Sequence, residues 1–407
     1  EHCQPTPGQG ICVGADETFF DLPILVLIEL ASGFIFTEVK SANRTYQSWS
    51  AQLQSWWQER QWACHFLVSD GARALVKLAL SGIGCASVPD LFHAIRALGR
   101  PLGGPLARAV NQAQKQVEKQ SEKLAKTTDS GKRQVCEEHL AEALEQQQQC
   151  EQTQQTYRNA LATMSTCGHP FRLGTSQRQS AATLTTALAA PLSVLAGLAT
   201  DNNCKSVDKA IATFEGHIPD LAGGIQAWWQ WAIQALAMET TDLDTQHWVL
   251  TAMLPWVYWT QQAEKTRQPE LKRRYQAAAS AAFEDLIEHP FTERIDDRQH
   301  KPWQHWCLGM AAKYQRTSSA VEGRNGYLSQ RHHVTRGFSE QSLKTLTTIH
   351  NFDLRRADGT TAAQRLFGYQ FPDLFEWVLS QTTDLPLPRM SNKAHQLKPS
   401  YAEPFPD

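Results

Sequence analysis

Long hydrophobic runs, closely spaced cysteines and an excess of positive charge are all missing from this sequence. The nine cysteines include no Cys-x-x-Cys pair, and their odd number argues against a disulfide framework or a zinc ribbon. Reduced thiols in a cytoplasm fit this pattern best. The longest apolar run, Leu22 to Ala31, is interrupted by Pro23 and Glu29 and is too short to cross a bilayer. We therefore expect a cytoplasmic globular protein without a membrane span.

The slightly negative net charge limits how this chain could bind a nucleic acid. The formal net charge is −2, whereas proteins that bind nucleic acid electrostatically usually carry an excess of Lys and Arg. Any surface of that kind must therefore be a local patch, or must lie partly outside these residues. At 407 residues, with 42% hydrophobic and 20% charged residues, the chain is long enough for two or three globular units.

The first unit, residues 1–104, has the pattern of a mixed α/β fold. Apolar runs rich in β-branched residues predict strands, and apolar residues at three- and four-residue spacing predict helices. The order is strand, strand, strand, helix, strand, helix, strand, helix, which favours a mixed sheet covered by helices. The predicted strands are Ile11–Ala15, Ile24–Leu30, Gly33–Val39, Cys64–Ser69 and Cys85–Val88; the predicted helices are Arg44–Arg60, Ala72–Leu80 and Leu91–Leu98.

The strand pattern disappears between residues 105 and 285, which we predict to be an all-helical insertion. Residues 107–155 are rich in Gln, Glu, Lys and Ala and predict two long helices in an antiparallel hairpin, broken near Asp129. Pro191 should kink or break a later helix. Six tryptophans between residues 225 and 259 should be mostly core. Residues 286–384 return to the first unit, and residues 385–407 form an extended tail rich in proline.

Two aspartates follow predicted strands and can meet at one edge of the sheet. Asp16 comes directly after the first strand and Asp70 directly after the fourth. Ligands of α/β sheets collect at such edges, and two neighbouring carboxylates need a cation between them. Glu322, on a helix that should begin near Ser318, could complete a site for two Mg²⁺ ions.

Each acid also has a structural explanation. Glu17 or Asp21 could be the ligand in place of Asp16, and Asp70 in Ser-Asp-Gly could form a turn or cap the next helix. Ser319-Ala-Val-Glu322 fits a capping box, in which the Glu bonds back to the start of its own helix.

The arrangement of the three acids resembles that of the DDE transposases of bacterial insertion sequences. Shorter motifs extend the resemblance: Asp90-Leu-Phe-His93 is similar to their D-x-F-H element, and Glu322-Gly-Arg-Asn325 to the E-G-x-N pattern of their Glu helix. His350-Asn-Phe, Asp358-Gly-Thr-Thr and Arg365-Leu-Phe-Gly are similar to the segment that commonly follows.

The resemblance implies a ribonuclease-H-like core interrupted by a large all-α insertion. It implies DNA cleavage and strand transfer, with Asp16, Asp70 and Glu322 as catalytic and metal-binding residues for two Mg²⁺ or Mn²⁺ ions. The alternatives are a nuclease of the same fold without strand transfer and a domesticated relative that binds DNA without catalysis. The implied setting is a bacterial cytoplasm, in association with the nucleoid.

Basic residues close to Glu322 are the candidates for contact with the element ends and the target DNA. They are Arg324, Arg331, His332 and Arg336, together with His93 near the scissile phosphate. Arg324 and Arg331 are two helical turns apart and should share a face. A solvated basic face, and a packing or helix-start role for His93, are the alternatives. Because the first residue is Glu1 and few basic residues cluster, tight binding should depend on a missing N-terminal domain or on a homodimer.

Overall fold

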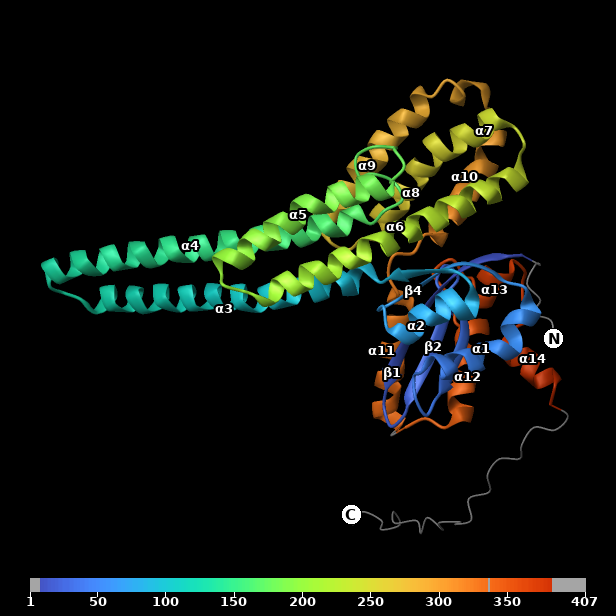
Figure 1. Cartoon of the computed structure of the whole chain (residues 1–407), viewed down its shortest axis with the longest axis horizontal. Helices are drawn as coiled ribbons and strands as arrows, with labels where there is room; N and C mark the ends of the chain where they lie inside the picture. Colours follow the sequence, from blue (N-terminus) through green and yellow to red (C-terminus); the bar gives the residue numbers. More distant parts are fainter. Residues whose placement is uncertain (1–7, 336, 383–407) are drawn as a thin grey trace, which may run out of the picture.

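The computed structural model describes residues 8–335 and 337–382, and it has a sheet-based part and a long helical part (Figure 1). The sheet has the order β3-β2-β1-β4-β5, with β1 in the centre. The β1–β2 and β2–β3 pairs are antiparallel, whereas β1–β4 and β4–β5 are parallel. The mixed sheet predicted from the sequence is confirmed. The strands are β1 Gly10–Phe19, β2 Pro23–Glu29, β3 Ile35–Lys40, β4 Ala63–Ser69 and β5 Ala86–Pro89.

Both faces of the sheet are buried, which explains why its strands have nearly continuous apolar sequences. Alternate residues of each strand point to opposite faces. Cys12, Val26 and Val68 join a large core shared with the helical part. Ile11 and Val13 join a smaller core under α1 (Tyr46–Arg60), α2 (Arg73–Lys77) and the π-helical turn η1 (Leu78–Ile83).

Two predicted boundaries in this part were wrong. Strand β1 runs to Phe19, not to Ala15, because β2 pairs with β1 from Val13 as far as Phe19. Asp16 therefore lies inside the strand, opposite Val26, and does not close it. The helix predicted over Leu91–Leu98 continues to Lys126 as α3, through Pro101 and Pro105.

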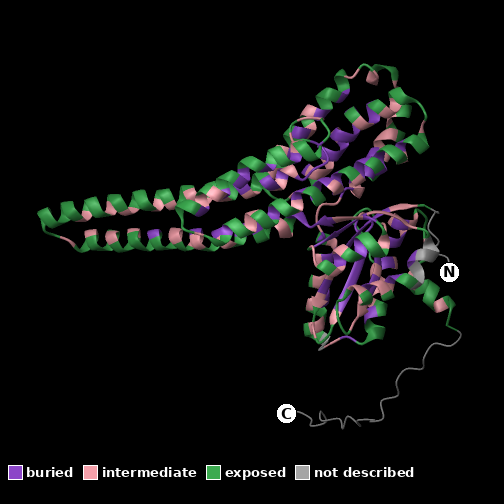
Figure 2. Cartoon of the chain, in the orientation of Figure 1, coloured by how far each residue is buried: buried purple, intermediate pink, exposed green. Residues whose placement is uncertain are grey.

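The helical part begins within α3, which forms the predicted hairpin with α4. Asp129 accepts a hydrogen bond from the Lys132 amide at the start of α4, which ends the turn. Figure 2 shows the far end of this hairpin mostly exposed, with patches of intermediate burial along both helices. The helices of this part are α3 Leu91–Lys126, α4 Ser130–Cys167, α5 Ala181–Asp201, α6 Ser206–Glu239, α7 Leu243–Trp248, α8 Leu254–Lys265, α9 Pro269–Glu288 and α10 Asp297–Lys313, with short turns η2 Val249–Met253 and η3 Thr292–Arg294.

Residues 105–285 contribute no strand to the five-stranded sheet, as predicted; an isolated bridge joins Phe171 and Arg178. The helical part extends beyond the predicted boundary at 285, because α10 packs against α8. Helix α5 continues through Pro191 without a break, and it packs between α4 and α6. It is the one helix in the described residues that is long and apolar enough to cross a membrane, with 28% of its most apolar window buried.

Tryptophans form much of the core of the helical part, as expected: Trp228, Trp229, Trp231, Trp248 and Trp259 are buried. Trp231 also joins this part to the sheet. Its ring stacks on His65 of β4 with centroids 4.2 Å apart, and it lies directly over Gly10 of β1. Burial lowers the pKa of His65 to about 4, so this stack is neutral at physiological pH.

The C-terminal helices return to the sheet and hold the β2–β3 hairpin. The Asn351 side chain bonds both the amide and the carbonyl of Ile35, each at 2.9 Å. His350 Nε2 lies 2.9 Å from the Gly33 carbonyl, and Arg365 donates to the Ser32 carbonyl. These contacts give the motifs after Glu322 a structural role. The helices are α11 Ser319–Thr335, α12 Glu340–Phe352, α13 Ala362–Phe367 and α14 Leu374–Ser380.

Candidate metal and nucleic-acid site

Asp16 and Asp70 meet because β1 and β4 are parallel neighbours. Gly14 of β1 is in register with Val68 of β4, so two residues further along, Asp16 and Asp70 are side by side. Both line a pocket of about 280 Å³, together with His93 of α3 and His217 of α6. The predicted pairing of these two acids at the sheet edge is therefore observed, although Asp16 is within its strand.

Glu322 approaches the same place from α11, which packs closely against β1. Gly14 permits this approach, because a Cβ there would lie 2.9 Å from Cγ2 of the buried Val321. One turn along α11, Asn325 donates a hydrogen bond of 2.9 Å from Nδ2 to Oδ2 of Asp16. The motif that contains Glu322 thus contacts the first aspartate directly.

His93 connects Glu322 to the pocket. Its Nε2 lies 3.1 Å from Oε1 of Glu322, and the Glu322 side chain is 36% exposed. Glu322 lies in the first turn of α11. Because its carboxylate contacts His93, the side chain points to α3. His93 Nδ1 is buried, 3.7 Å from Oδ2 of Asp90, and has no hydrogen-bond partner among the described residues.

Asp90 fixes the relative position of α3 and α11. Its Oδ1 accepts a hydrogen bond from the His93 amide at the start of α3. Its Oδ2 accepts two more, from the amide and the hydroxyl of Ser318, at 2.6 and 2.7 Å. The Leu91 amide also donates to the Arg316 carbonyl. His93 and Glu322 meet because this buried carboxylate holds the starts of both helices.

The surroundings of Asp16 raise the pKa of its carboxyl group. Burial raises the pKa of Asp16 above its usual value, and the carboxylates of Asp70 and Glu322 raise it further, while His93 opposes this shift. Such a cluster favours a bound cation, and carboxylate oxygens are the ligands that Mg²⁺ and Mn²⁺ prefer.

A second donor set overlaps the first. Asp90, His93 and Glu322 each offer a ligand atom, and these atoms lie within 4.8 Å of one another. Both Asp90 oxygens, however, already accept hydrogen bonds from the protein. A cation bound there would compete with these hydrogen bonds. The oxygens of Asp16, Asp70 and Glu322 do not all lie within 4.8 Å of one another in the described residues, so the expected convergence of these three acids is only partly observed.

The structural alternatives for the acids are partly observed. Asp70 accepts a hydrogen bond from the Ala72 amide at 2.8 Å, so it does form a turn, with only one of its oxygens. Glu17 is buried and accepts from Trp49 Nε1 at 3.3 Å, on the other side of the strand from Asp16. Asp21 lies in the bend between β1 and β2. Neither Glu17 nor Asp21 lines the pocket.

The expectation that Arg324 contacts DNA was wrong. Its guanidinium makes two hydrogen bonds of 2.6 Å to the Glu38 carboxylate, and the side chain is only 3% exposed. Arg324 and Arg331 do share a face, since both guanidinium groups lie over Tyr327, 5.0 and 5.6 Å from its ring centroid. Arg331 is exposed, whereas Arg324 serves to attach α11 to β3.

His332 has a packing role instead of the predicted contact with DNA. Its ring stacks on Phe20 with centroids 4.3 Å apart, and its Nε2 is buried without a hydrogen-bond partner among the described residues. Arg336 lies outside the described residues. Sequence reasoning missed His217, which no motif indicated, and the positioning roles of Asp90 and Asn325, which stood within the quoted motifs.

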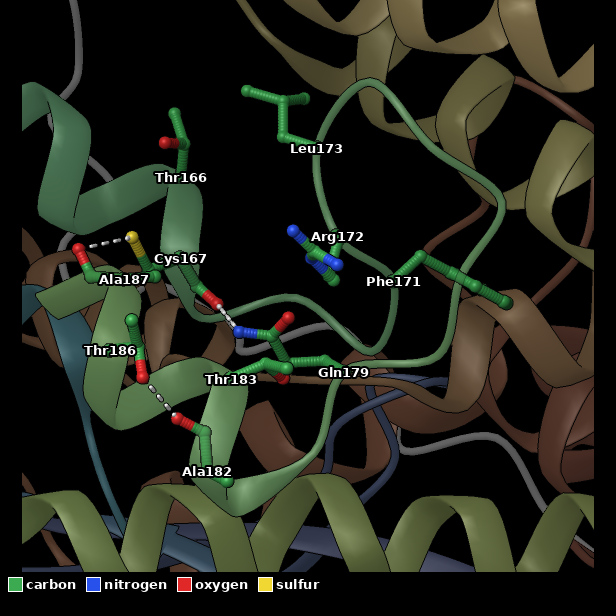
Figure 3. A pocket seen from close by; sticks show the side chains of 10 residues that line it. All are labelled: Thr166, Cys167, Phe171, Arg172, Leu173, Gln179, Ala182, Thr183, Thr186 and Ala187. Carbon is green, nitrogen blue, oxygen red and sulfur yellow. Dashed lines mark hydrogen bonds between the residues drawn. The ribbon is translucent and has the colours of Figure 1, made fainter.

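A larger cavity, of about 410 Å³, lies in the helical part at the C-terminal end of α4 and the start of α5 (Figure 3). Its lining includes no carboxylate. The Thr186 hydroxyl donates to the Ala182 carbonyl, and the Cys167 thiol contacts the Ala187 carbonyl (Figure 3). Because its lining holds no acid or base suited to phosphoryl transfer, the smaller pocket at the sheet edge is the candidate site.

Comparison with known proteins gives one match. A family of unknown function, DUF6399, matches residues 249–394, a segment that includes Glu322 and all of α11. This is less than half of the chain. No curated protein and no solved structure matches.

Proposed function

We propose that this chain is the catalytic region of a DDE-type DNA transposase, which cleaves DNA strands and transfers them to a target in a metal-dependent reaction. The observation that carries the proposal is that Asp16 and Asp70 line one pocket while Glu322 contacts His93 of the same lining and raises the pKa of Asp16, although the three acids come from segments far apart in the sequence. Separate structural roles for three scattered acids would not require them to lie near one pocket.

The strand arrangement supports a ribonuclease-H-like core. Three antiparallel strands are followed by two that run parallel to the first, with an acid on the central strand and another after its parallel neighbour. The helical segment between β5 and Glu322 is consistent with the insertion that many of these enzymes carry.

In the proposed site, Asp16, Asp70 and Glu322 hold two Mg²⁺ or Mn²⁺ ions. When bound, such ions activate water or a 3′-hydroxyl and neutralise charge on the scissile phosphate. The remaining contributions come from the chain itself. Asn325 orients the Asp16 carboxylate, Asp90 positions the starts of α3 and α11, and His93 holds the Glu322 carboxylate through Nε2.

The proposal includes DNA as the partner, a homodimer in the active complex, and a cytoplasmic, nucleoid-associated setting. With a net charge of −2, one copy of this chain should hold DNA weakly at physiological salt. A dimer pools two sets of basic residues such as Arg331.

The test uses DNA taken from the flanks of the gene and cut at any inverted repeat found there. With Mg²⁺ or Mn²⁺, the protein should join precut 3′-ends to a target plasmid, and Glu322→Gln should abolish joining. Release of nicked or fragmented DNA without joined product would favour a nuclease of the same fold. Binding without either product would favour a non-catalytic relative, and the proposal would be wrong in both cases.

A further inference from the structure

The carboxylate pocket continues into a second cavity, so that the two form one groove between α3 and α6. The second cavity measures about 250 Å³ and shares Ala94, Ala97 and His217 with the first. Volumes of this size are at the low end for small-molecule pockets, so the groove is too narrow for a double helix.

The two walls of the groove differ in character. On α6, Lys209, Thr213 and His217 are four residues apart and form a polar stripe that runs to the carboxylates. On α3, Ala94 and Ala97 are small and leave the space open.

The floor of the groove is apolar, and the charged side chains that line the groove beyond the carboxylate pocket are basic. Leu98 and the buried Phe214 form the floor. Beyond the carboxylate pocket, the titratable residues that line the groove are Lys209 and His217, so no carboxylate lines this section. A cationic and hydroxyl-bearing wall above an apolar floor suits a single nucleic-acid strand, with phosphates on the wall and sugars or bases on the floor.

We infer that this groove binds an unpaired single strand of the DNA at the reacting end, and leads it away from the carboxylates. The inference rests on the proposed function, because the groove opens at the proposed catalytic pocket. It assigns to α6 of the helical part a direct role in holding the substrate, with Lys209 and His217 as phosphate contacts.

The test is a comparison of DNA affinities in EDTA, where no cleavage can occur. Fluorescence anisotropy would compare a blunt duplex with the same duplex carrying a single-stranded extension, of either polarity. The native chain should bind one of the extended duplexes at least about tenfold more tightly than the blunt one. Lys209→Glu, and Ala97→Trp, which fills the groove, should reduce this preference to within about twofold.

Matched substitutions outside the groove provide the controls. Lys272→Glu makes the same charge change on the exposed surface of α9, and Ala212→Trp adds the same bulk on an exposed part of α6 that does not line the groove. Both should keep the preference. Equal affinity of the native chain for blunt and extended duplexes would overturn the inference, as would an equal effect of Lys209→Glu and Lys272→Glu.

The outcome is separable from that of the proposed function. A preference for extended DNA without any cleavage in Mg²⁺ or Mn²⁺ would support the groove and contradict the transposase proposal. Cleavage and joining without that preference would contradict the groove alone.

Discussion

The Asp90 carboxylate accepts two hydrogen bonds from Ser318, one from the amide at 2.6 Å and one from the hydroxyl at 2.7 Å. Asp90 follows the last strand of the sheet and Ser318 precedes the Glu helix, so this contact joins the two ends of the core across the whole helical part. The Asp90 side chain is 1% exposed, and its third hydrogen bond begins the helix that carries His93. This carboxylate, together with the hydrogen bond from the Leu91 amide to the Arg316 carbonyl, sets the distance between His93 and Glu322.

Asp90→Ala should therefore lower both stability and metal affinity. It leaves the Ser318 amide and hydroxyl and the His93 amide without their acceptor, and we expect a loss of about 2–4 kcal/mol in the free energy of unfolding. Ser318→Ala removes only the hydroxyl and should cost about 1 kcal/mol. Urea unfolding and Mn²⁺ titration would measure the two effects. An Asp90→Ala protein as stable as the native chain would show that the contact is not structural.

The raised pKa of Asp16 predicts that this carboxylate destabilises the metal-free protein at neutral pH. A pKa above the ordinary value of 3.8 means that Asp16 favours folding at low pH, and that this contribution is lost as pH rises through the folded-state pKa. Asp16→Asn keeps an acceptor oxygen for Asn325, so its melting temperature in EDTA at pH 7 should exceed that of the native chain. Near pH 3 the difference should disappear.

Mg²⁺ should reverse the order of these two proteins. It should raise the melting temperature of the native chain and have little effect on Asp16→Asn. Thermal melts in EDTA and in Mg²⁺ across pH 3–8 would test both parts. A lower melting temperature for Asp16→Asn in EDTA at pH 7 would contradict the account.

The Arg324–Glu38 pair should matter for stability and not for DNA binding. Arg324→Met leaves the Glu38 carboxylate buried with only the Thr347 hydroxyl, and we expect a loss of about 3–5 kcal/mol. The double variant Arg324→Met/Glu38→Gln should recover part of this loss. Denaturant unfolding would measure it, and anisotropy would check that Arg324→Met, where folded, binds DNA like the native chain. A stable variant with weakened DNA binding would contradict this prediction and support the contact between Arg324 and a phosphate that was expected from the sequence.

Gly10 should be required for the close packing of the helical part against the sheet. A Cβ at this position would lie 2.6 Å from Cε2 of Trp231, so Gly10→Ala should destabilise the protein by about 1–3 kcal/mol. Gly309→Ala in α10 is the control, since nothing lies within 4 Å of the added methyl group, and it should stabilise by about 0.5–1 kcal/mol. Chemical unfolding of both variants would decide. A neutral Gly10→Ala would mean that Trp231 yields easily.

Continuous apolar runs allowed the sheet to be predicted strand by strand, because both of its faces are buried. The end of β1 was missed because Asp16 and Glu17 interrupt the apolar pattern, although β2 continues to pair with them. The length of α3 was missed because Pro101 and Pro105 normally end a helix. In both cases tertiary pairing outweighed the local signal.

The acidic residues of the candidate site could be predicted from their residue type and position in the sequence. The roles of residues that depend on contacts between distant segments were missed. Asp70 and Glu322 could be singled out because their placement along the chain, taken together with Asp16, resembles a known arrangement of three acids, although each alone also fits a turn or a helix cap. Arg324 could not be distinguished from a surface cation, because its partner Glu38 comes from β3, far away in the sequence. His217 reaches the pocket only through the path of α6 over the sheet.

The most direct test of the central claim is Mn²⁺ binding by titration calorimetry, with electron paramagnetic resonance to count free ions. Asp16→Asn, Asp70→Asn and Glu322→Gln should each weaken binding by at least about tenfold. Glu17→Gln, next to Asp16 but directed to the other face of β1, should bind Mn²⁺ like the native chain. Native affinity in any of the first three variants, or an equal loss in Glu17→Gln, would contradict a metal site formed by these three carboxylates.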